Sequence, residues 1–348
     1  MKRLIWTALV VMLGASVLAG SALAGELTLN VLGQPLATGL IQKNKEQPFF
    51  ENFSKNVGFE AKVNYKPIDV TGIKSEETLR VLKSGLFDIV SLRIAQAARD
   101  EPFLLGQDIV GLNPDYKTAR KVYDAYAPHF DQDLQQKFNS RLLGLWPFGP
   151  QVLFCIPEIK GLKDLKGKKV RVYDQSIAQF MESLGAIPVA IGFAETQQAL
   201  ARGVAECAIT GASSANTAGW PEVTNYFMPI GFQVGFNGYA MNLNSWKKLT
   251  ADQQKKLQAG IDALNKDIWT YSEEIFLDAV RCNVGKDPCT TVTKFKMKEV
   301  PVTDADLKLV AEAVKTISLP AWGKVCERST PGCVEKWKQI LGPVTGIK

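Results

Sequence analysis

Side chains that carry out catalysis in common enzyme classes are scarce or poorly placed in this sequence. The single histidine, His129, lies in a charged run of helical character, so a hydrolase triad would lack the usual base for its nucleophile. The carboxylates Asp69, Asp88 and Asp174 could do acid–base chemistry as in glycosidases, but no spacing marks two of them as a pair. No strand is followed by a Gly-x-Gly-x-x-Gly motif, and a Walker loop and a Gly-x-Ser-x-Gly elbow are absent. We therefore expect a binding protein without catalytic residues or a cofactor.

Four of the six cysteines are spaced for local disulfides. Cys282 and Cys289 enclose one polar, turn-rich segment, and Cys326 and Cys333 enclose another. Both segments are short enough to close as loops, and oxidising compartments preserve such bonds. We predict the disulfides Cys282–Cys289 and Cys326–Cys333.

The other two cysteines, Cys155 and Cys207, lie in apolar runs, where small buried thiols are the expectation. A zinc site is a poor alternative, because no two cysteines have the close spacing of zinc ligands and His129 is far away in sequence. We expect no metal site.

The first 24 residues have the features of a cleavable export signal. Lys2 and Arg3 precede an uncharged stretch rich in Ala, Val and Leu, which ends in Ala-Leu-Ala just before Gly25. A membrane anchor is the alternative, but glycine and serine interrupt the apolar run before it reaches the roughly 20 residues that a span needs. We interpret residues 1–24 as a signal peptide and expect the mature protein in the periplasm.

The charge of the chain indicates what the protein binds. The formal net charge is +6 at pH 7, and removal of Lys2 and Arg3 with the signal leaves about +4, spread along the sequence. This distribution favours an anionic ligand and does not indicate nucleic-acid binding.

Predicted strands and helices alternate along most of the mature chain. The strands are expected at 26–32, 61–68, 88–92, 142–146, 151–156, 170–173, 187–191, 206–210 and 238–243. The helices are expected at 40–55, 75–85, 117–139, 176–184, 194–202 and 249–279. This βαβ rhythm predicts an α/β protein with a mostly parallel sheet.

The length of the mature chain, roughly 324 residues, predicts two lobes. Their expected limits are 25–148 plus about 235–275 for lobe I, and 149–234 plus about 276–348 for lobe II. Since no flexible linker is present, we expect the hinge at the Gly- and Pro-rich crossings 147–150 and 231–237. Ligands of such folds bind between the lobes, at the carboxyl ends of strands.

Three motifs between residues 161 and 210 occur in a familiar order. They are Gly-Leu-Lys-Asp-Leu-Lys-Gly-Lys-Lys-Val-Arg-Val, Leu-Gly-Ala-Ile-Pro-Val and Phe-Ala-Glu-Thr-Gln-Gln-Ala-Leu-Ala-Arg-Gly-Val-Ala-Glu. This order resembles the DctP-type substrate-binding proteins of TRAP (tripartite ATP-independent periplasmic) transporters. The runs that begin at Leu79 and Trp246 look like the same family, so the resemblance covers nearly the whole mature chain.

The resemblance implies a two-lobed periplasmic binding protein fold, with a ligand cleft between the lobes and a long helix that links them. It also implies a function: capture of a small organic acid and delivery to two separate TRAP membrane subunits. In that family an ion gradient drives transport, so no ATP site is expected in this chain.

Under the resemblance, Arg171 corresponds to the family arginine that binds the ligand carboxylate. Its chemistry fits, because a guanidinium is a planar fork of donors that matches a carboxylate and stays charged when desolvated. The alternative is a solvated arginine at the end of a strand. Phe193 matches a family aromatic that lines the cleft, although a phenylalanine in such a run is more often a core residue.

Other positions depart from the family pattern. Gln151 stands where many members have another arginine, and Thr210 stands where sialic-acid and dicarboxylate binders often have asparagine. Arg93 follows a predicted strand, at a position where sialic-acid binders place an acid. These departures argue against sialic acid and ordinary C4-dicarboxylates as ligands.

Aromatic residues near these positions suggest the body of the ligand. Trp146, Phe148, Trp220 and Tyr239 could each be core residues, but with the two arginines they predict a pocket for a monocarboxylate with an apolar or aromatic body. We expect Asn237 to add a polar contact when the lobes close. The alternatives are an ABC-type or sensory binding module, or an exported enzyme that acts on small acids.

Overall fold

The computed structural model describes residues 26–36 and 39–347. The signal peptide expected at residues 1–24 lies outside the described residues. Within those residues, no helix combines the length and the apolar character needed to span a bilayer.

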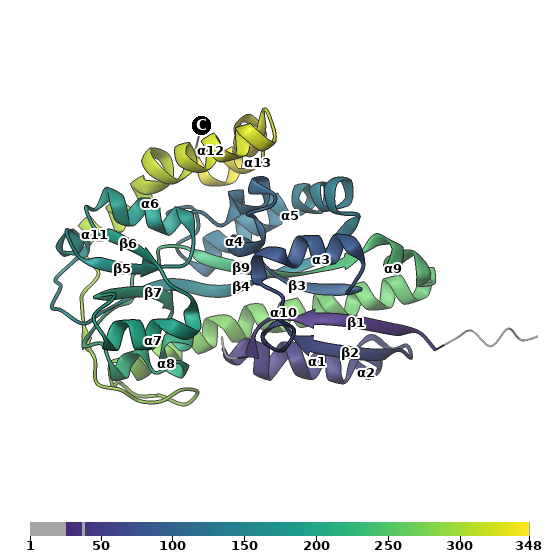
Figure 1. The fold of residues 1–348 in the computed structure, drawn as a ribbon, viewed down its shortest axis with the longest axis horizontal. Coiled ribbons are helices and arrows are strands. Elements are labelled where there is room, and N and C mark those ends of the chain that lie inside the picture. The colour runs from purple at the N-terminus through teal and green to yellow at the C-terminus, as the bar shows by residue number, and fades with distance from the viewer. Residues whose placement is uncertain (1–25, 37–38, 348) are drawn as a thin grey trace, which may run out of the picture.

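The molecule has two lobes, each built on a sheet, and two long strands pass between them (Figure 1). The strand order is β2-β1-β3-β9-β4-β7-β5-β6. The first-lobe strands are β1 Thr28–Gly33, β2 Lys62–Pro67 and β3 Ile89–Arg93. The second-lobe strands are β5 Lys169–Val172, β6 Ile187–Ala190, β7 Cys207–Gly211, β8 Tyr226–Met228 and β10 Lys298–Glu299. The shared strands are β4 Ser140–Cys155 and β9 Val234–Asn242.

Strand direction differs between the outer and the shared strands. β1 pairs in parallel with β2 and β3, and β5 pairs in parallel with β6 and β7, as the βαβ rhythm predicts. β9 is antiparallel to β3 and β4, and β4 is antiparallel to β7 and β8. The sheet is therefore mixed, and the carboxyl ends of β1, β3, β5 and β7 all face the space between the lobes.

β4 is one strand of 16 residues, where the sequence predicts two. The Gly- and Pro-rich segment 147–150 does not end it, because the ladder with β9 shifts register between Pro147 and Gly149. Gly149 has φ +107°, which L side chains rarely adopt. The irregularity is therefore absorbed as a bulge within a continuous strand.

Thirteen α-helices cover the sheets within the described residues. The first-lobe helices are α1 Gln47–Glu51, α2 Phe53–Val57, α3 Thr78–Ser84, α4 Ile94–Ala97, α5 Tyr116–Phe138 and α9 Leu243–Lys248. The second-lobe helices are α6 Gln175–Ser183, α7 Phe193–Ala201, α8 Ala212–Thr217 and α11 Asp304–Ala313. The remaining three are α10 Ala251–Asn283, α12 Leu319–Ser329 and α13 Cys333–Thr345. The single helix expected at 40–55 is instead a π-helical turn, Gln42–Glu46, followed by α1 and α2.

α10 links the two lobes, as the resemblance implies (Figure 1). Thr250 caps its first turn in a capping box with Gln253. Leu257 and Ile261, near its start, pack in the core that contains β1, whereas Ala279, near its end, packs in the core that contains β7. A helix of 33 residues is about 50 Å long, which is enough to reach across both lobes.

The last two helices pack on the first lobe, although the sequence assigns them to lobe II. Trp322 of α12 and Trp337 of α13 lie in the same core cluster as Leu79 and Val90. The indole of Trp322 donates to the carbonyl oxygen of Pro102 at 2.7 Å. α11, in contrast, packs in the lobe II core through Val310 and Ala313. The expected limits were wrong here because an amphipathic pattern does not specify which apolar surface a helix covers.

The structure contains three disulfides. Cys282 is bonded to Cys289, and Cys326 is bonded to Cys333. The third joins Cys155 to Cys207, for which the sequence favoured buried thiols without deciding whether the two are free or paired. These two cysteines are directly opposite each other in the antiparallel pair of β4 and β7, with their Cα atoms 4.1 Å apart. That pairing is a tertiary contact over 52 residues, which spacing does not reveal.

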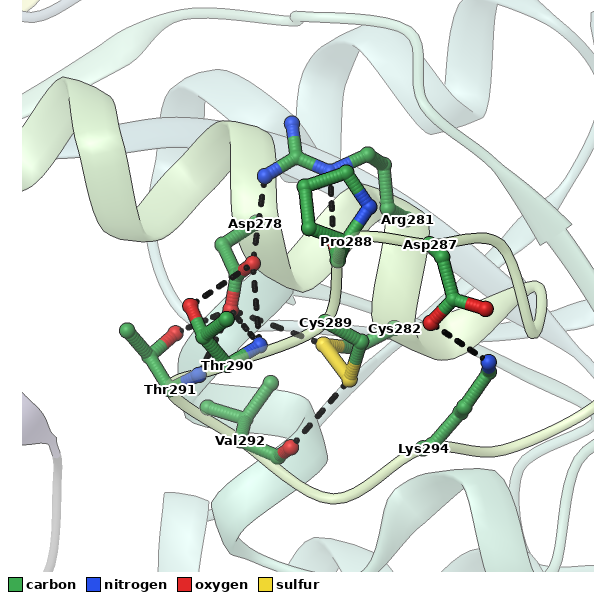
Figure 2. Close-up of polar contacts among 10 residues, drawn as sticks. All are labelled: Asp278, Arg281, Cys282, Asp287, Pro288, Cys289, Thr290, Thr291, Val292 and Lys294. Carbon is green, nitrogen blue, oxygen red and sulfur yellow. Dashed lines mark hydrogen bonds and ion pairs between the residues drawn. A yellow bond between two sulfur atoms is a disulfide. The ribbon is translucent and has the colours of Figure 1, made fainter.

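A cluster around Asp278 fixes the segment that follows the Cys282–Cys289 disulfide (Figure 2). The Asp278 carboxylate accepts hydrogen bonds from the backbone N–H groups of Thr290 and Thr291 and from Arg281. Burial by itself raises the pKa of this carboxyl, but the hydrogen bonds from Thr291, Thr290 and Arg281 outweigh it and lower the pKa to about 2. The loop is thereby held against α10.

Candidate functional site

A cavity of about 310 Å³ lies between the two lobes. The first lobe contributes Gln34, Pro35, Asp69, Ser75, Arg93 and Gln96. The shared strand β4 and the second lobe contribute Phe148, Gln151, Arg171, Tyr173, Phe193 and Thr210. Several of these residues end or directly follow parallel strands, which is where ligands bind in folds of this kind.

Arg171 provides a buried positive charge in this cavity. It lies in β5 with only 3% of its surface exposed. Its Nε donates to the carbonyl oxygen of Ile191 and its Nη1 to that of Ile209, both at 2.9 Å. Burial lowers the pKa of the guanidinium to about 10, so it remains protonated at neutral pH. The two carbonyls fix the orientation of the side chain and leave Nη2 for another partner.

No carboxylate of the described residues forms an ion pair with Arg171 or with Arg93. A buried charge without a partner is costly, because the protein interior replaces its hydration poorly. Arg171 also lies over the ring of Trp220, at 5.5 Å, and near that of Tyr173, at 5.9 Å. Aromatic faces offset only part of this cost. The arrangement therefore favours binding of an anion.

Arg93 is the second guanidinium at the cavity. It ends β3, and its Nη1 donates to Oδ1 of Asn237 at 3.2 Å. Its guanidinium lies over the ring of Phe148 at 4.7 Å and that of Tyr173 at 5.4 Å. A Cβ on Gly235 would be 2.8 Å from both of its terminal nitrogens, so this glycine leaves the space that Arg93 occupies. Arg93 is thus held at the cavity by groups from β4, from β9 and from the residue that follows β5.

Two glutamines bring neutral polar groups to the same cavity. Gln34 donates from its side chain to the carbonyl oxygen of Ser91 at 2.6 Å, and its backbone N–H donates to the buried Glu46. Gln151 donates to the carbonyl oxygen of Gly149 at 2.9 Å. Both side chains are almost fully buried and fixed by these bonds. They therefore offer preformed contacts for a polar ligand group.

The structure brings five of the eight expected ligand-binding residues to the cavity: Arg171, Arg93, Gln151, Phe193 and Thr210. Their contacts with a ligand remain a prediction. The other three are buried and do not line the cavity: Trp146 lies in β4, Asn237 in β9 and Trp220 in the 3-10 turn at 220–222.

Trp146, Trp220 and Asn237 do not line the cavity. Trp146 is fully buried in an apolar cluster, with its ring 6.1 Å from that of Tyr239. Trp220 lies beneath Arg171, and Asn237 holds Arg93. The expectation that Trp146 contacts the ligand is therefore not supported by its position, and Trp220 and Asn237 contact the two arginines and not the cavity.

Sequence reasoning missed Tyr173, which contacts both guanidiniums. A signal was available, because Tyr173 is the first residue after β5 and so lies at a carboxyl strand end. It also missed Gln34, which follows β1 in the same way. Asp69 and Asp174 were considered only as catalytic acids, yet Asp69 lies at the rim of this cavity.

Comparison with known proteins identifies a matching family of solute-binding proteins. The sequence profile of the family described as bacterial extracellular solute-binding protein, family 7 (DctP), matches residues 44–281.

Solved structures with the same fold cover almost the whole chain. A Desulfovibrio salexigens TRAP periplasmic solute-binding protein with bound orotic acid has a TM-score of 0.77 at 15% identity, over 92% of this chain and 100% of that chain. A marine metagenome TRAP solute-binding protein with co-purified pyroglutamate has a TM-score of 0.74 at 20% identity, over 90% of this chain and 99% of that chain. A Bordetella pertussis extracytoplasmic solute receptor that binds pyroglutamic acid has a TM-score of 0.75 at 14% identity, over 89% of this chain and 99% of that chain.

Proposed function

This chain belongs to the DctP family, family 7 of the bacterial extracellular solute-binding proteins, and from that membership we propose which solute it captures. The protein is a TRAP-type solute receptor and not an enzyme. Its ligand is a small organic acid with one carboxylate and an apolar or aromatic body. After capture in the periplasm, the receptor delivers this acid to TRAP membrane subunits.

One observation carries the proposal of an acid: the buried Arg171 guanidinium lies in the cavity without a carboxylate partner in the described residues. A ligand carboxylate would satisfy Nη2 and compensate the charge. Charge-assisted bonds of this kind are short and strong, and the guanidinium geometry matches a carboxylate.

The size and walls of the cavity support a small ligand with an apolar body. A volume of about 310 Å³ is at the lower end of the range for small-molecule sites. The rings of Phe148, Tyr173 and Phe193 are part of the lining. The pyroglutamate and orotate of the structural relatives are small cyclic acids with a single carboxylate, which supports this class of ligand.

The two-lobed fold supports a mechanism for capture. The open receptor binds the carboxylate at Arg171, and the lobes then close over the ligand. Gln151, Thr210 and Arg93 complete the polar contacts as water leaves. The membrane subunits recognise the closed form.

A calorimetric screen of small carboxylic acids tests this proposal. We expect the wild-type protein to bind at least one monocarboxylate, and Arg171→Ala to weaken that binding more than tenfold, because a charge-assisted contact is worth several times RT. Arg202→Ala removes an exposed arginine of the same lobe and should leave the affinity unchanged. Tight binding of sialic acid or succinate alone, or an unchanged affinity in Arg171→Ala, would show that the proposal is wrong.

A further inference from the structure

Behind Arg93, away from the cavity, lies a cluster of polar side chains that ligand capture alone does not explain. Asp108 follows the 3-10 helix Pro102–Gln107, Gln233 precedes β9, and Asp174 follows β5. Asp108 and Gln233 are completely buried. The cluster thus joins three segments that are distant in sequence, at the junction of the two lobes.

One amide links the two carboxylates. Nε2 of Gln233 donates to Oδ1 of Asp108 at 3.0 Å and lies 3.4 Å from Oδ2 of Asp174. The other oxygen of Asp108 accepts the backbone N–H of Phe236 at 3.1 Å. Asp174 also caps α6 by accepting the N–H of Ile177 at 2.8 Å. Two acids that share one donor in a buried place repel each other when both are ionised.

The charged and titratable groups that face Asp108 come from two elements. They are Arg93 at the end of β3, and Tyr173 and Asp174 after β5. From β9 and the residue before it come only neutral groups, the Gln233 amide and the Phe236 N–H. Burial raises the pKa of Asp108 to about 7, Arg93 opposes this rise, and Asp174 adds to it. Burial likewise raises the pKa of Asp174.

The two acids are coupled, and near neutral pH the partial protonation of Asp108 leaves the pair with less negative charge than two ionised carboxylates would carry. This negative charge acts on Arg93 through both acids and on Arg171 through Asp174. Asp69 adds little, because it lies at the exposed rim, where water screens its charge. Because Asp108 adds to the compensation of Arg93, Arg171 keeps more of its positive charge uncompensated at the cavity.

We propose that Asp108 and Asp174 compensate the charge of Arg93 on its side away from the cavity. The site therefore prefers ligands with one carboxylate, which binds Arg171, and a neutral oxygen acceptor, which binds Arg93. Dicarboxylates bind less tightly. This inference rests on the proposed function and narrows its ligand class. Arg93 still has donors for the ligand, because Asn237 accepts from Nη1 alone. A carbonyl or amide oxygen can accept from these donors without bringing a second negative charge.

Matched ligand pairs test the selectivity. Succinamate and succinate, glutaramate and glutarate, and terephthalamate and terephthalate each differ only in an amide that replaces a carboxylate. In calorimetry at pH 7, we expect the wild-type protein to bind the amide member of a pair at least about tenfold more tightly. The double variant Asp108→Asn, Asp174→Asn removes the compensating charge, and we expect it to shift the ratio at least about tenfold toward the dicarboxylate.

The single variants test the shared charge. Either one leaves a single acid to compensate Arg93, so the ligand preference should shift less than in the double variant. In the wild type, the affinity for the amide ligand should fall between pH 6 and pH 8, as the second acid ionises and reduces the attraction for a monoanion. This pH dependence should be lost in Asp108→Asn, and kept in the exposed control Asp304→Asn. These single-variant profiles decide the question if the double variant does not fold.

The outcomes separate this inference from the proposed function. A wild type that prefers the dicarboxylates, or an unchanged ratio in the folded double variant, overturns the selectivity mechanism and leaves acid capture intact. A pH profile that is the same in wild type and Asp108→Asn also overturns it. If the wild type binds no monocarboxylate at all, the proposed function fails, and this inference fails with it.

Discussion

At the scale of single residues, two arginines of the same charge are held in different ways. Arg171 is fixed by two backbone carbonyl groups, and Arg93 by one amide and two aromatic rings. Backbone carbonyls carry partial charges only, and of the two acids Asp108 and Asp174, both act on Arg93 but only Asp174 adds to the carbonyls at Arg171. The difference makes Arg171 the group that needs an anion most.

A substitution at Gly235 tests how strongly ligand affinity depends on the position of the Arg93 side chain. Because an added Cβ would meet only the end of the flexible Arg93 side chain, we expect Gly235→Ala to fold with a nearly unchanged melting temperature and to bind its ligand about tenfold more weakly. Calorimetry with the best monocarboxylate measures the affinity. If the effect acts through Arg93, Gly235→Ala should change nothing further in an Arg93→Ala background. An equal loss in both backgrounds would show another cause.

A substitution at Asp278 tests how much one buried carboxylate contributes to the free energy of unfolding. Its pKa of about 2 in the folded protein lies below the ordinary value of 3.8, so its contribution is present above about pH 4 and is lost as the pH falls through about 2. We expect Asp278→Asn to lower the free energy of unfolding by about 2 kcal/mol at pH 7 and by much less at pH 2. Urea unfolding at both pH values measures this difference. Asp287→Asn, an exposed acid in the same loop, should cost under about 0.5 kcal/mol.

At the scale of elements, β4 connects the lobes and provides one half of the Cys155–Cys207 disulfide. This bond closes a loop of 52 residues and holds β7, whose last residues include Thr210 of the cavity. The other two disulfides each close a separation of 7 residues. A longer closed loop restricts the unfolded chain more.

The three disulfides should therefore contribute unequally. We expect Cys155→Ala with Cys207→Ala to lower the free energy of unfolding by about 4 kcal/mol, and Cys326→Ala with Cys333→Ala to lower it by about 2 kcal/mol, from the dependence of loop-closure entropy on loop length. Denaturant unfolding of the oxidised proteins measures both values. A larger loss for the short loop would contradict the entropic explanation.

At the scale of the whole molecule, three long elements cross between the lobes: β4, β9 and α10 (Figure 1). With continuous strands at the crossing, we propose that closure occurs by bending at their irregular places, such as the bulge near Gly149. The limits of the lobes elsewhere in the chain remain a proposal. α12 and α13 cover the first lobe and add a surface that the sequence did not predict.

Closure should be visible in solution. We expect the radius of gyration, measured by small-angle X-ray scattering, to decrease when the best monocarboxylate saturates the wild-type protein, because the lobes approach each other around it. Arg171→Ala at the same ligand concentration should keep the unbound value. A ligand that binds tightly in calorimetry but leaves the scattering unchanged would show that capture does not require closure.

Local patterns in the sequence determined much of this protein. The alternation of strands and helices, the motif around Arg171 and the spacing of Cys282 and Cys289 each depend on neighbouring residues, so the sequence alone predicted them. Only the tertiary structure decided which distant segments meet. It paired Cys155 with Cys207, placed α13 on the first lobe and brought Asp108 behind Arg93. Such contacts depend on the register of strands and the docking of apolar faces, and a single chain's local pattern permits several of each.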